Sequence, residues 1–274
     1  MKILIATDME GITGVTSWDQ VTPSHAEYAR FRRLMTEDVN AAVRGAYDAG
    51  ADQVLVADGH WNGSNILIEE LDPRARLNTG SPSPFSMMQG IDKTIDGVMF
   101  VGYHARNGSP NAILDHTWSS KSVANVWVNG ILTGEYGLNA GLAGHFGVPV
   151  ILVTGDQTTC AQVTDLLGAV ESAVVKQASG RFAAECLAPQ VAQETIRLSA
   201  ERAVQRLVRR DVPQPFVLEA PVTVSVEFFT SDMADRATCI PLTEREGTRV
   251  SLTAHEMISA YSGFRSMVML ASGG

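Results

Sequence analysis

Hydrophobic residues in this chain form short continuous runs, and stretches with helical periodicity lie between them. Runs of strand length are predicted at residues 2–8, 53–58, 97–103, 148–154 and 172–177. Helical patterns are predicted at residues 26–49, 136–146 and 159–168. Continuous apolar strands are typical of a sheet that is buried on both faces, which means a mainly parallel sheet flanked by helices. The pattern therefore predicts an α/β fold.

The pattern changes between residues 116 and 134, where β-rich segments lie on both sides of Asn129-Gly130. This dipeptide is the strongest short signal for a hairpin, because both residues tolerate the positive φ of a type I′ turn. A hairpin inserted into the sheet domain is the prediction that follows.

A long helix predicted at about residues 189–210 ends before Pro213. Strand-rich segments then follow at residues 217–218, 222–228 and 249–253, with a closing helix near 255–271. We expect an α/β domain over residues 1–212, which includes the hairpin, and a smaller α+β domain over residues 213–274. The hairpin can pack with this second unit.

Composition excludes several classes of protein. The 274 residues carry a formal charge of -9 and are 45% hydrophobic, as in ordinary globular chains. Basic residues form no large block, so nucleic acid is not an expected partner, since phosphate recognition draws on concentrated positive charge. No run approaches the ~20 apolar residues of a membrane span, and the apolar start is too short for a signal peptide. We expect a cytoplasmic protein that does not bind a membrane.

Three predicted strands end in side chains of types that bind metals: Asp8 and Glu10 after the first, Asp58 and His60 after the second, and His104 after the third. In an open α/β sheet, ligands bind beyond the carboxyl ends of the strands, so residues far apart in sequence can meet there. Imidazole nitrogen beside carboxylate oxygen suits zinc or a similar divalent ion. These positions predict a metal site.

Each of these residues also has a simpler interpretation. An acid after a strand can cap the next helix, and a lone histidine is commonly a hydrogen-bonded loop residue. Glu135, which opens a predicted helix, is of the kind favoured by the helix dipole. However, Asp8 and Glu10 repel each other at such close spacing, and a cation between them would explain the arrangement.

His116 lies beyond His104 in a loop rich in turn-forming residues. Such a loop can place an imidazole opposite a metal, where it would transfer a proton or stabilise an oxyanion. Five candidate ligands are too many for one tetrahedral zinc with an open position. Two ions bridged by a carboxylate would use all five, and such pairs activate a water for attack on an amide or ester carbonyl. Asp8, the first residue off its strand, is the natural bridge.

Together, five segments resemble the D-aminopeptidase (DppA-like) family of dinuclear zinc peptidases, peptidase family M55. They are residues 8–14, 58–60, 84–90, 102–106 and 134–140. The resemblance implies that Asp8 is shared by two zinc ions and that His116 is catalytic. The ligands that it implies are Asp8, Glu10, His60, His104 and Glu135.

The resemblance also implies an activity. It implies a metal-dependent aminopeptidase (EC 3.4.11) that hydrolyses the N-terminal residue of short peptides or aminoacyl amides through a water activated by two Zn2+ per subunit, with Mn2+ or another divalent ion as alternatives. It further implies a ring-like, self-compartmentalising homo-oligomer, a decamer. Preference for D- or L-residues stays open at this point. The chain departs from the family at Trp61, where an aromatic can reshape the substrate pocket, and in a slightly longer loop before His116.

Two other functions remain open. The segment from Asp8 to Thr13 also resembles the Asp-x-Asp-x-Thr signature of haloacid dehalogenase-like, Mg-dependent phosphatases, in which Asp8 would be the nucleophile and Lys176 part of a later motif. That hypothesis leaves His60 and His104 without a role. A non-enzymatic metal-binding assembly protein is the other alternative. Trp118 and Trp127 would then form an oligomer contact, although such residues also fill cores.

Overall fold

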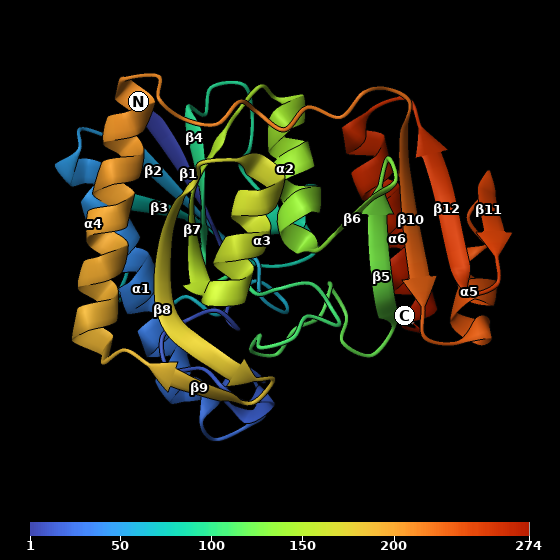
Figure 1. Ribbon diagram of the computed structural model, residues 1–274, viewed down its shortest axis with the longest axis horizontal. Coiled ribbons are helices and arrows are strands. Elements are labelled where there is room, and N and C mark those ends of the chain that lie inside the picture. Colours follow the sequence, from blue (N-terminus) through green and yellow to red (C-terminus); the bar gives the residue numbers. More distant parts are fainter. Residues whose placement is uncertain (274) are drawn as a thin grey trace.

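Two sheets stand side by side in the computed structural model, which describes residues 1–273 (Figure 1). The larger sheet has seven strands in the order β3 (Ala75–Asn78), β2 (Gln53–Asp58), β1 (Lys2–Thr7), β4 (Gly97–Val101), β7 (Val150–Asp156), β8 (Glu171–Gly180) and β9 (Ala183–Cys186). The smaller sheet has five strands in the order β11 (Thr243–Glu246), β12 (Arg249–Ala254), β10 (Val222–Phe228), β5 (Val123–Val128) and β6 (Ile131–Thr133).

The larger sheet is parallel from β3 to β8, and only β9 runs antiparallel to its neighbour. Its central strands are buried on both faces, as the continuous apolar runs predicted. In β1, for example, residues Ile3, Leu4, Ile5 and Ala6 are fully buried. The predicted α/β class with a mainly parallel sheet is therefore confirmed.

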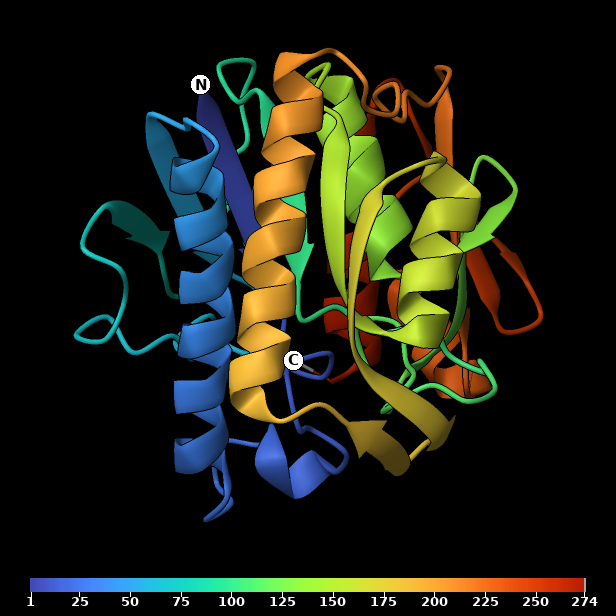
Figure 2. The same ribbon diagram turned by 60° about the vertical axis from the view of Figure 1, so that its left-hand side comes forward.

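Helices cover both faces of the larger sheet. Figure 2 shows α1 (Tyr28–Asp48) and α4 (Pro189–Val208) side by side on one face, where they share a core with β1 and its neighbours. On the other face lie α3 (Gln157–Leu167) and α2 (Glu135–His145). Helix α2 also faces the smaller sheet, which explains why almost all of its residues are buried.

The smaller sheet is built around the predicted hairpin. Its turn at Asn129-Gly130 has positive φ at both residues, 47° and 80°, as a type I′ turn requires. Strand β5 of the hairpin pairs antiparallel with β10, so strands from both sides of residue 212 share one sheet. Helices α5 (Ser231–Ala237) and α6 (Met257–Ala271) complete this part of the molecule.

Several details differ from the sequence-based expectations. Residues 209–221 cross from α4 to β10 without helix or strand, so the strand expected at 217–218 does not form (Figure 1). The short elements β3, β9, β11 and α5 were not predicted. The three strands among them are edge strands without a buried residue, so they lack the apolar run that marks a buried strand.

The aromatic residues of the hairpin region fill space within the fold. Trp118 makes edge contacts with Tyr261 and Phe264 of α6 at 6.0 and 5.1 Å between ring centroids. The Arg249 guanidinium lies 3.8 Å over the Trp127 ring. Both tryptophans are therefore partly covered within a single chain.

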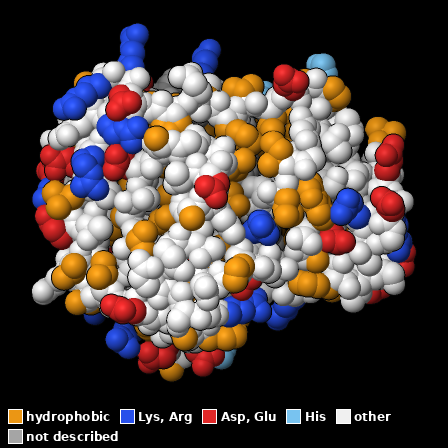
Figure 3. All heavy atoms as spheres, viewed as in Figure 1, with side chains coloured by type: hydrophobic (Ala, Val, Ile, Leu, Met, Phe, Trp, Pro, Cys, Tyr) orange, Lys and Arg blue, Asp and Glu red, His pale blue; other side chains and the backbone are white. Residues whose placement is uncertain are grey.

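Exposed hydrophobic side chains gather over the junction of the two sheets in Figure 3, whereas basic side chains gather toward the α4 end. Ile131 and Leu132 of the hairpin and Val217 of the crossing segment are among the exposed hydrophobic residues. Within residues 1–273, no helix combines the length and the apolar character needed to cross a bilayer.

Strand register determines where the candidate site forms. Thr7 at the end of β1 pairs with Asp58 of β2 on one side and with Val101 of β4 on the other. The chain therefore leaves three neighbouring strands at the same level. The strand order also reverses between β1 and β4, and such a switch point is where open α/β sheets bind ligands.

Candidate metal centre

The loops that leave β1 and β4 are bound closely to each other. Asp8 N donates to Val101 O at 2.9 Å, and Gly11 N donates to Gly102 O at 2.8 Å. A Cβ on Gly11 would lie 1.9 Å from Tyr103 O, and one on Gly102, whose φ is 75°, would lie 2.3 Å from Asp8 O. Only glycine permits this approach. The close contact brings the residues after β1 next to those after β4.

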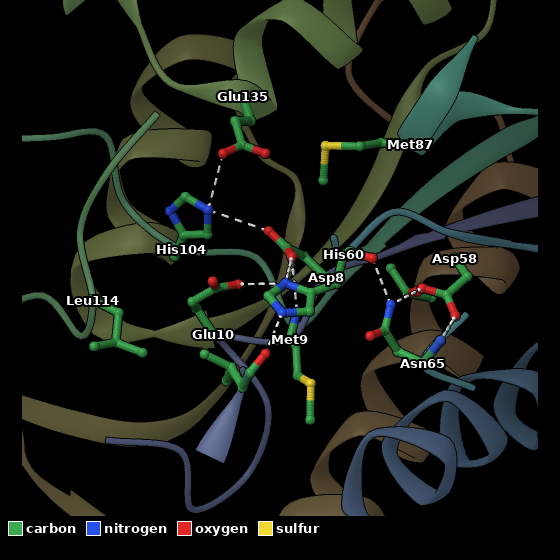
Figure 4. Close-up of polar contacts among 12 residues, drawn as sticks. Asp8, Met9, Glu10, Asp58, His60, Asn65, Met87, His104, Leu114 and Glu135 are labelled. Atoms are coloured by element: carbon green, nitrogen blue, oxygen red, sulfur yellow. Dashed lines mark hydrogen bonds and ion pairs between the residues drawn. The ribbon is translucent and has the colours of Figure 1, made fainter. Parts of the chain in front are cut away.

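Asp8 lies at the middle of the resulting cluster (Figure 4). Its Oδ1 is 3.1 Å from His60 Nδ1, and its Oδ2 is 3.2 Å from His104 Nε2. Glu10 Oε2 approaches the same His60 nitrogen at 3.2 Å, and Glu135 Oε1 approaches His104 Nε2 at 3.2 Å. The five side chains thus form two groups, each with one imidazole and two carboxylates, and Asp8 belongs to both.

The backbone orients both imidazoles. His60 Nε2 lies 2.8 Å from Val21 O, and His104 Nδ1 lies 3.1 Å from Ala105 O. A carbonyl only accepts hydrogen bonds, so the nitrogen beside it carries the hydrogen. In a neutral ring the other nitrogen then turns its lone pair toward the carboxylates. Lone pairs in this position require a proton or a cation between them.

Two buried atoms of the cluster also lack the partner that a proton or a cation would provide. Among the described residues, Glu10 Oε2 and His104 Nε2 are buried and have no hydrogen-bond partner. Buried polar atoms are almost always satisfied, so each such exception calls for an explanation. Metal ions bound in the two groups would coordinate these two atoms.

The carboxylates make the site strongly attractive to positive charge. Burial by itself would lower the pKa of His60, but Glu10 and Asp8 outweigh it and hold that pKa well above its usual range. At His104 burial again opposes the charged form, and Glu135 and Asp8 again raise the pKa well above its usual range. Burial would raise the pKa of Asp8, yet its contacts with the two imidazoles hold it well below the usual range. Divalent cations can supply this charge with both imidazoles neutral.

The donor set fits zinc. Each of the two imidazole–carboxylate groups offers three nitrogen or oxygen ligands. Catalytic zinc sites take three protein ligands and keep a further position open. The carbonyls behind His60 and His104 are the kind of partner that orients ligand histidines. Two groups of three residues can each place their ligand atoms within 4.8 Å of one another: Asp8, Glu10 and His104, and His104, His116 and Glu135.

His116 borders the same cluster at longer distances. Its Nδ1 lies 2.8 Å from Leu114 O, which leaves Nε2 facing the site, 3.9 Å from both Glu10 Oε1 and Glu135 Oε1. The ring stacks on His104 with 3.9 Å between centroids. Burial, together with the neighbouring His104, lowers the pKa of His116 to about 4. The ring is therefore neutral at pH 7, with a free lone pair.

Of two further acids that follow or precede predicted elements, Glu135 lies in the cluster and Asp58 lies outside it. Glu135 is the first residue of α2, as expected, and its Oε1 also accepts a hydrogen bond from Trp118 N at 2.6 Å. Asp58 stands apart from the five. Its carboxylate accepts from Asn65 Nδ2 at 2.7 Å and from Ile66 N at 2.8 Å. Asp58 therefore shapes the loop that holds His60.

Sequence reasoning missed several residues around the cluster. Trp18 contacts the His116 ring edge-on at 5.4 Å between centroids, and Arg181 forms an ion pair with Asp115 at 3.0 Å. No local pattern marks either residue. Lys176 lies behind the β1 loop, and it did carry a signal, because a lysine inside an apolar strand needs a partner.

Comparisons with known proteins identify a family and two relatives. The model of the Peptidase_M55 family, described as D-aminopeptidase, matches residues 1–266. A D-aminopeptidase of Bacillus subtilis (strain 168) is 36% identical over 273 residues, which cover 99% of this chain and 98% of that protein. A solved structure, the Zn-dependent D-aminopeptidase DppA from Bacillus subtilis, described as a self-compartmentalizing protease, superimposes with a TM-score of 0.96. It is 34% identical, and the match covers 100% of this chain and 99% of that one.

Proposed function

This chain belongs to the Peptidase_M55 family of D-aminopeptidases, and we propose that it is a zinc-dependent aminopeptidase that releases the N-terminal residue of short peptides or aminoacyl amides. The family membership agrees with the resemblance found in the sequence. The names of both relatives favour a D-residue at the N-terminus of the substrate, so we extend the proposal to that handedness.

One observation carries the proposal of two zinc ions per subunit. Asp8 turns one carboxylate oxygen toward each of two imidazole–carboxylate groups. Asp8, Glu10 and His60 would hold one ion, and Asp8, His104 and Glu135 the other. Zinc bound there supplies Lewis acidity, which polarises a scissile carbonyl and lowers the pKa of a water so that it can attack.

The protein supplies proton transfer through His116. Its Nδ1 donates to Leu114 O, so the lone pair on Nε2 is free to accept a proton from the attacking water. The protonated ring can then return that proton to the departing amine. Stacking on His104 and the edge contact with Trp18 hold the ring in place while it does so.

The two alternative functions are less well supported. In a haloacid dehalogenase-like phosphatase Asp8 would be a nucleophile, but here its oxygens approach two imidazoles. Lys176, assigned to that mechanism, instead directs its three donors to backbone carbonyls. A purely structural metal site would use His116 only as a further ligand beside His104 and Glu135.

Metal analysis and activity assays test the proposal together. The purified chain should contain two zinc ions, and a chelator should abolish release of D-residues from D-aminoacyl amides, with zinc restoring it. Asp8→Asn should lose both ions, because both halves share this side chain, whereas Glu135→Gln should weaken mainly one. Full activity in zinc-free protein would contradict the proposal. Cleavage of L-aminoacyl amides alone would overturn only the assigned handedness.

A further inference from the structure

Lys176 is a buried lysine in the middle of β8. Its side chain is 1% exposed, although neighbouring strand residues such as Val175 are apolar and pack in the core. Burying an ammonium is unfavourable unless its donors are satisfied. The ammonium has three donors, and all three are used: Nζ donates to Glu10 O at 2.7 Å, to Ile12 O at 2.8 Å and to Val15 O at 2.8 Å.

The three acceptors belong to one loop. Residues 8–16 leave β1 in a series of turns that carries the candidate ligands Asp8 and Glu10. Carbonyls of such a loop have no sheet or helix partners of their own, so they need another donor when they are buried. One ammonium therefore binds three of the nine carbonyls of this loop, of which Ile12 O also accepts a hydrogen bond from Val15 N at 3.2 Å. Because Glu10 supplies one of the carbonyls, the contact fixes the backbone of a candidate ligand directly.

A buried anion holds the same loop from the side of α1. Asp38 accepts hydrogen bonds from Thr13 N at 2.9 Å and from Thr13 Oγ1 at 2.9 Å. Carbonyls of the loop are thus bound by a cation, and an N–H of the loop by an anion. Neither Lys176 nor Asp38 contributes an atom to the five-residue cluster, yet both act on the segment that carries two of its members.

We infer that Lys176 is a positioning residue for the metal centre, since its ammonium holds the β1 loop in the shape that presents Asp8 and Glu10 to zinc. The inference rests on the proposed zinc site. It assigns Lys176 an effect on metal affinity that is separate from any effect on the stability of the fold.

Substitution with a side chain of similar length and no donors tests the inference. In Lys176→Met, zinc affinity measured by competition with a chromogenic chelator should fall by about tenfold or more, the usual effect of losing an outer partner of a ligand. In metal-free protein, amide hydrogen exchange should become faster at residues 9–16 than in the wild type. Lys176→Gln keeps two N–H donors, so its zinc affinity and exchange rates should lie between those of the wild type and of Lys176→Met. It serves in place of the Met variant if that variant does not fold.

A matched control separates positioning from stability. Val175→Ala also truncates a buried residue of β8 and should lower the stability of the fold, but it should leave zinc affinity and the exchange of residues 9–16 unchanged. If Lys176→Met or Lys176→Gln binds zinc as tightly as the wild type, the inference is wrong while the proposed function stands. If the wild-type chain itself binds no zinc, the proposed function is wrong and the inference fails with it.

Discussion

Each histidine of the candidate site turns one ring nitrogen toward the backbone and the other toward the carboxylates. Val21 O, Ala105 O and Leu114 O lie beside His60, His104 and His116 respectively. The sequence was sufficient to name all three rings, because they follow strand ends or a turn-rich loop. It could not reveal which nitrogen faces the site, because that depends on carbonyls brought near by the folded chain. The distances also distinguish His116, at 3.9 Å from the carboxylates, from the two closer rings.

His116→Ala should keep zinc and lose turnover. Because His116 lies outside the two carboxylate-bridged groups, zinc content should match that of the wild type. Removal of a proton-transfer group should lower kcat by about 10²- to 10⁴-fold. Steady-state kinetics and metal analysis on the same preparation check both parts, with the exposed His25→Ala as control. Loss of zinc in the variant would make His116 a ligand, and an unchanged kcat would remove it from the mechanism.

Strands with a continuous apolar run could be predicted from the sequence. Elements whose structure depends on contacts with distant parts of the chain could not. The strands β1, β2, β4, β7 and β8 and the helices around them appeared within a few residues of their expected ends, because burial on both faces leaves a clear sequence pattern. The hairpin was marked by its turn. Edge strands and the crossing segment at 209–221 depend on contacts far along the chain. The same holds for the approach of the β1 and β4 loops, which brings the candidate ligands together.

The contact of α1 with the β1 loop should make stability depend on pH. Burial raises the pKa of Asp38 from 3.8 to about 6, although hydrogen bonds from Thr13 oppose this rise. Between these values the folded chain keeps a proton that the unfolded chain has released, so stability falls as pH rises through this window. The loss amounts to roughly 3 kcal/mol, because a tenfold difference in proton affinity between the folded and unfolded chains corresponds to about 1.4 kcal/mol.

The Asp38→Asn variant has no carboxyl group at this position, so it lacks the fall in stability with rising pH that Asp38 causes. The stability of the variant relative to the wild type should therefore increase by roughly 3 kcal/mol from pH 4 to pH 7. Urea unfolding of chelator-treated protein at several pH values measures the difference. Glu37→Gln, a partly exposed neighbour on the same helix, should keep most of the fall in stability, because burial and not Glu37 is the main cause of the raised pKa of Asp38. Parallel curves for Asp38→Asn and the wild type would show that folding does not shift the pKa of Asp38.

At the scale of the whole molecule, the two sheets share one interior. Helix α2 and the residues around Trp118 belong to a core that extends from the larger sheet to the smaller one and to α6. Glu135 lies at the start of α2 and accepts a hydrogen bond from Trp118 N, so one candidate ligand is fixed where the two parts meet. A soft boundary near residue 212 was predicted because a long helix ends before Pro213 and a strand-rich segment follows. Such an order of elements along the chain does not reveal which side chains pack together across the boundary.

Assembly is the prediction that belongs to this scale. The solved relative is described as self-compartmentalizing, and we propose that this chain likewise forms a ring-like homo-oligomer, a decamer. Exposed hydrophobic residues such as Ile131, Leu132 and Val217 are available for contacts between copies. Ten chains of 29.4 kDa would give a particle of about 294 kDa in native mass spectrometry. A mass near that of one chain would contradict the proposal, and a different multiple would correct only the subunit number.

The position of Lys176 in the chain has a consequence for synthesis on the ribosome. All five candidate ligands lie between residues 8 and 135, so a nascent chain presents them well before β8 emerges. The early chain holds acids and imidazoles able to capture many divalent ions, but not the ammonium that shapes their loop. We expect tight binding of zinc to arise only after β8 has paired with β7, so metal loading follows the pairing of these strands. Chains stalled before and after β8 should therefore differ in zinc retention.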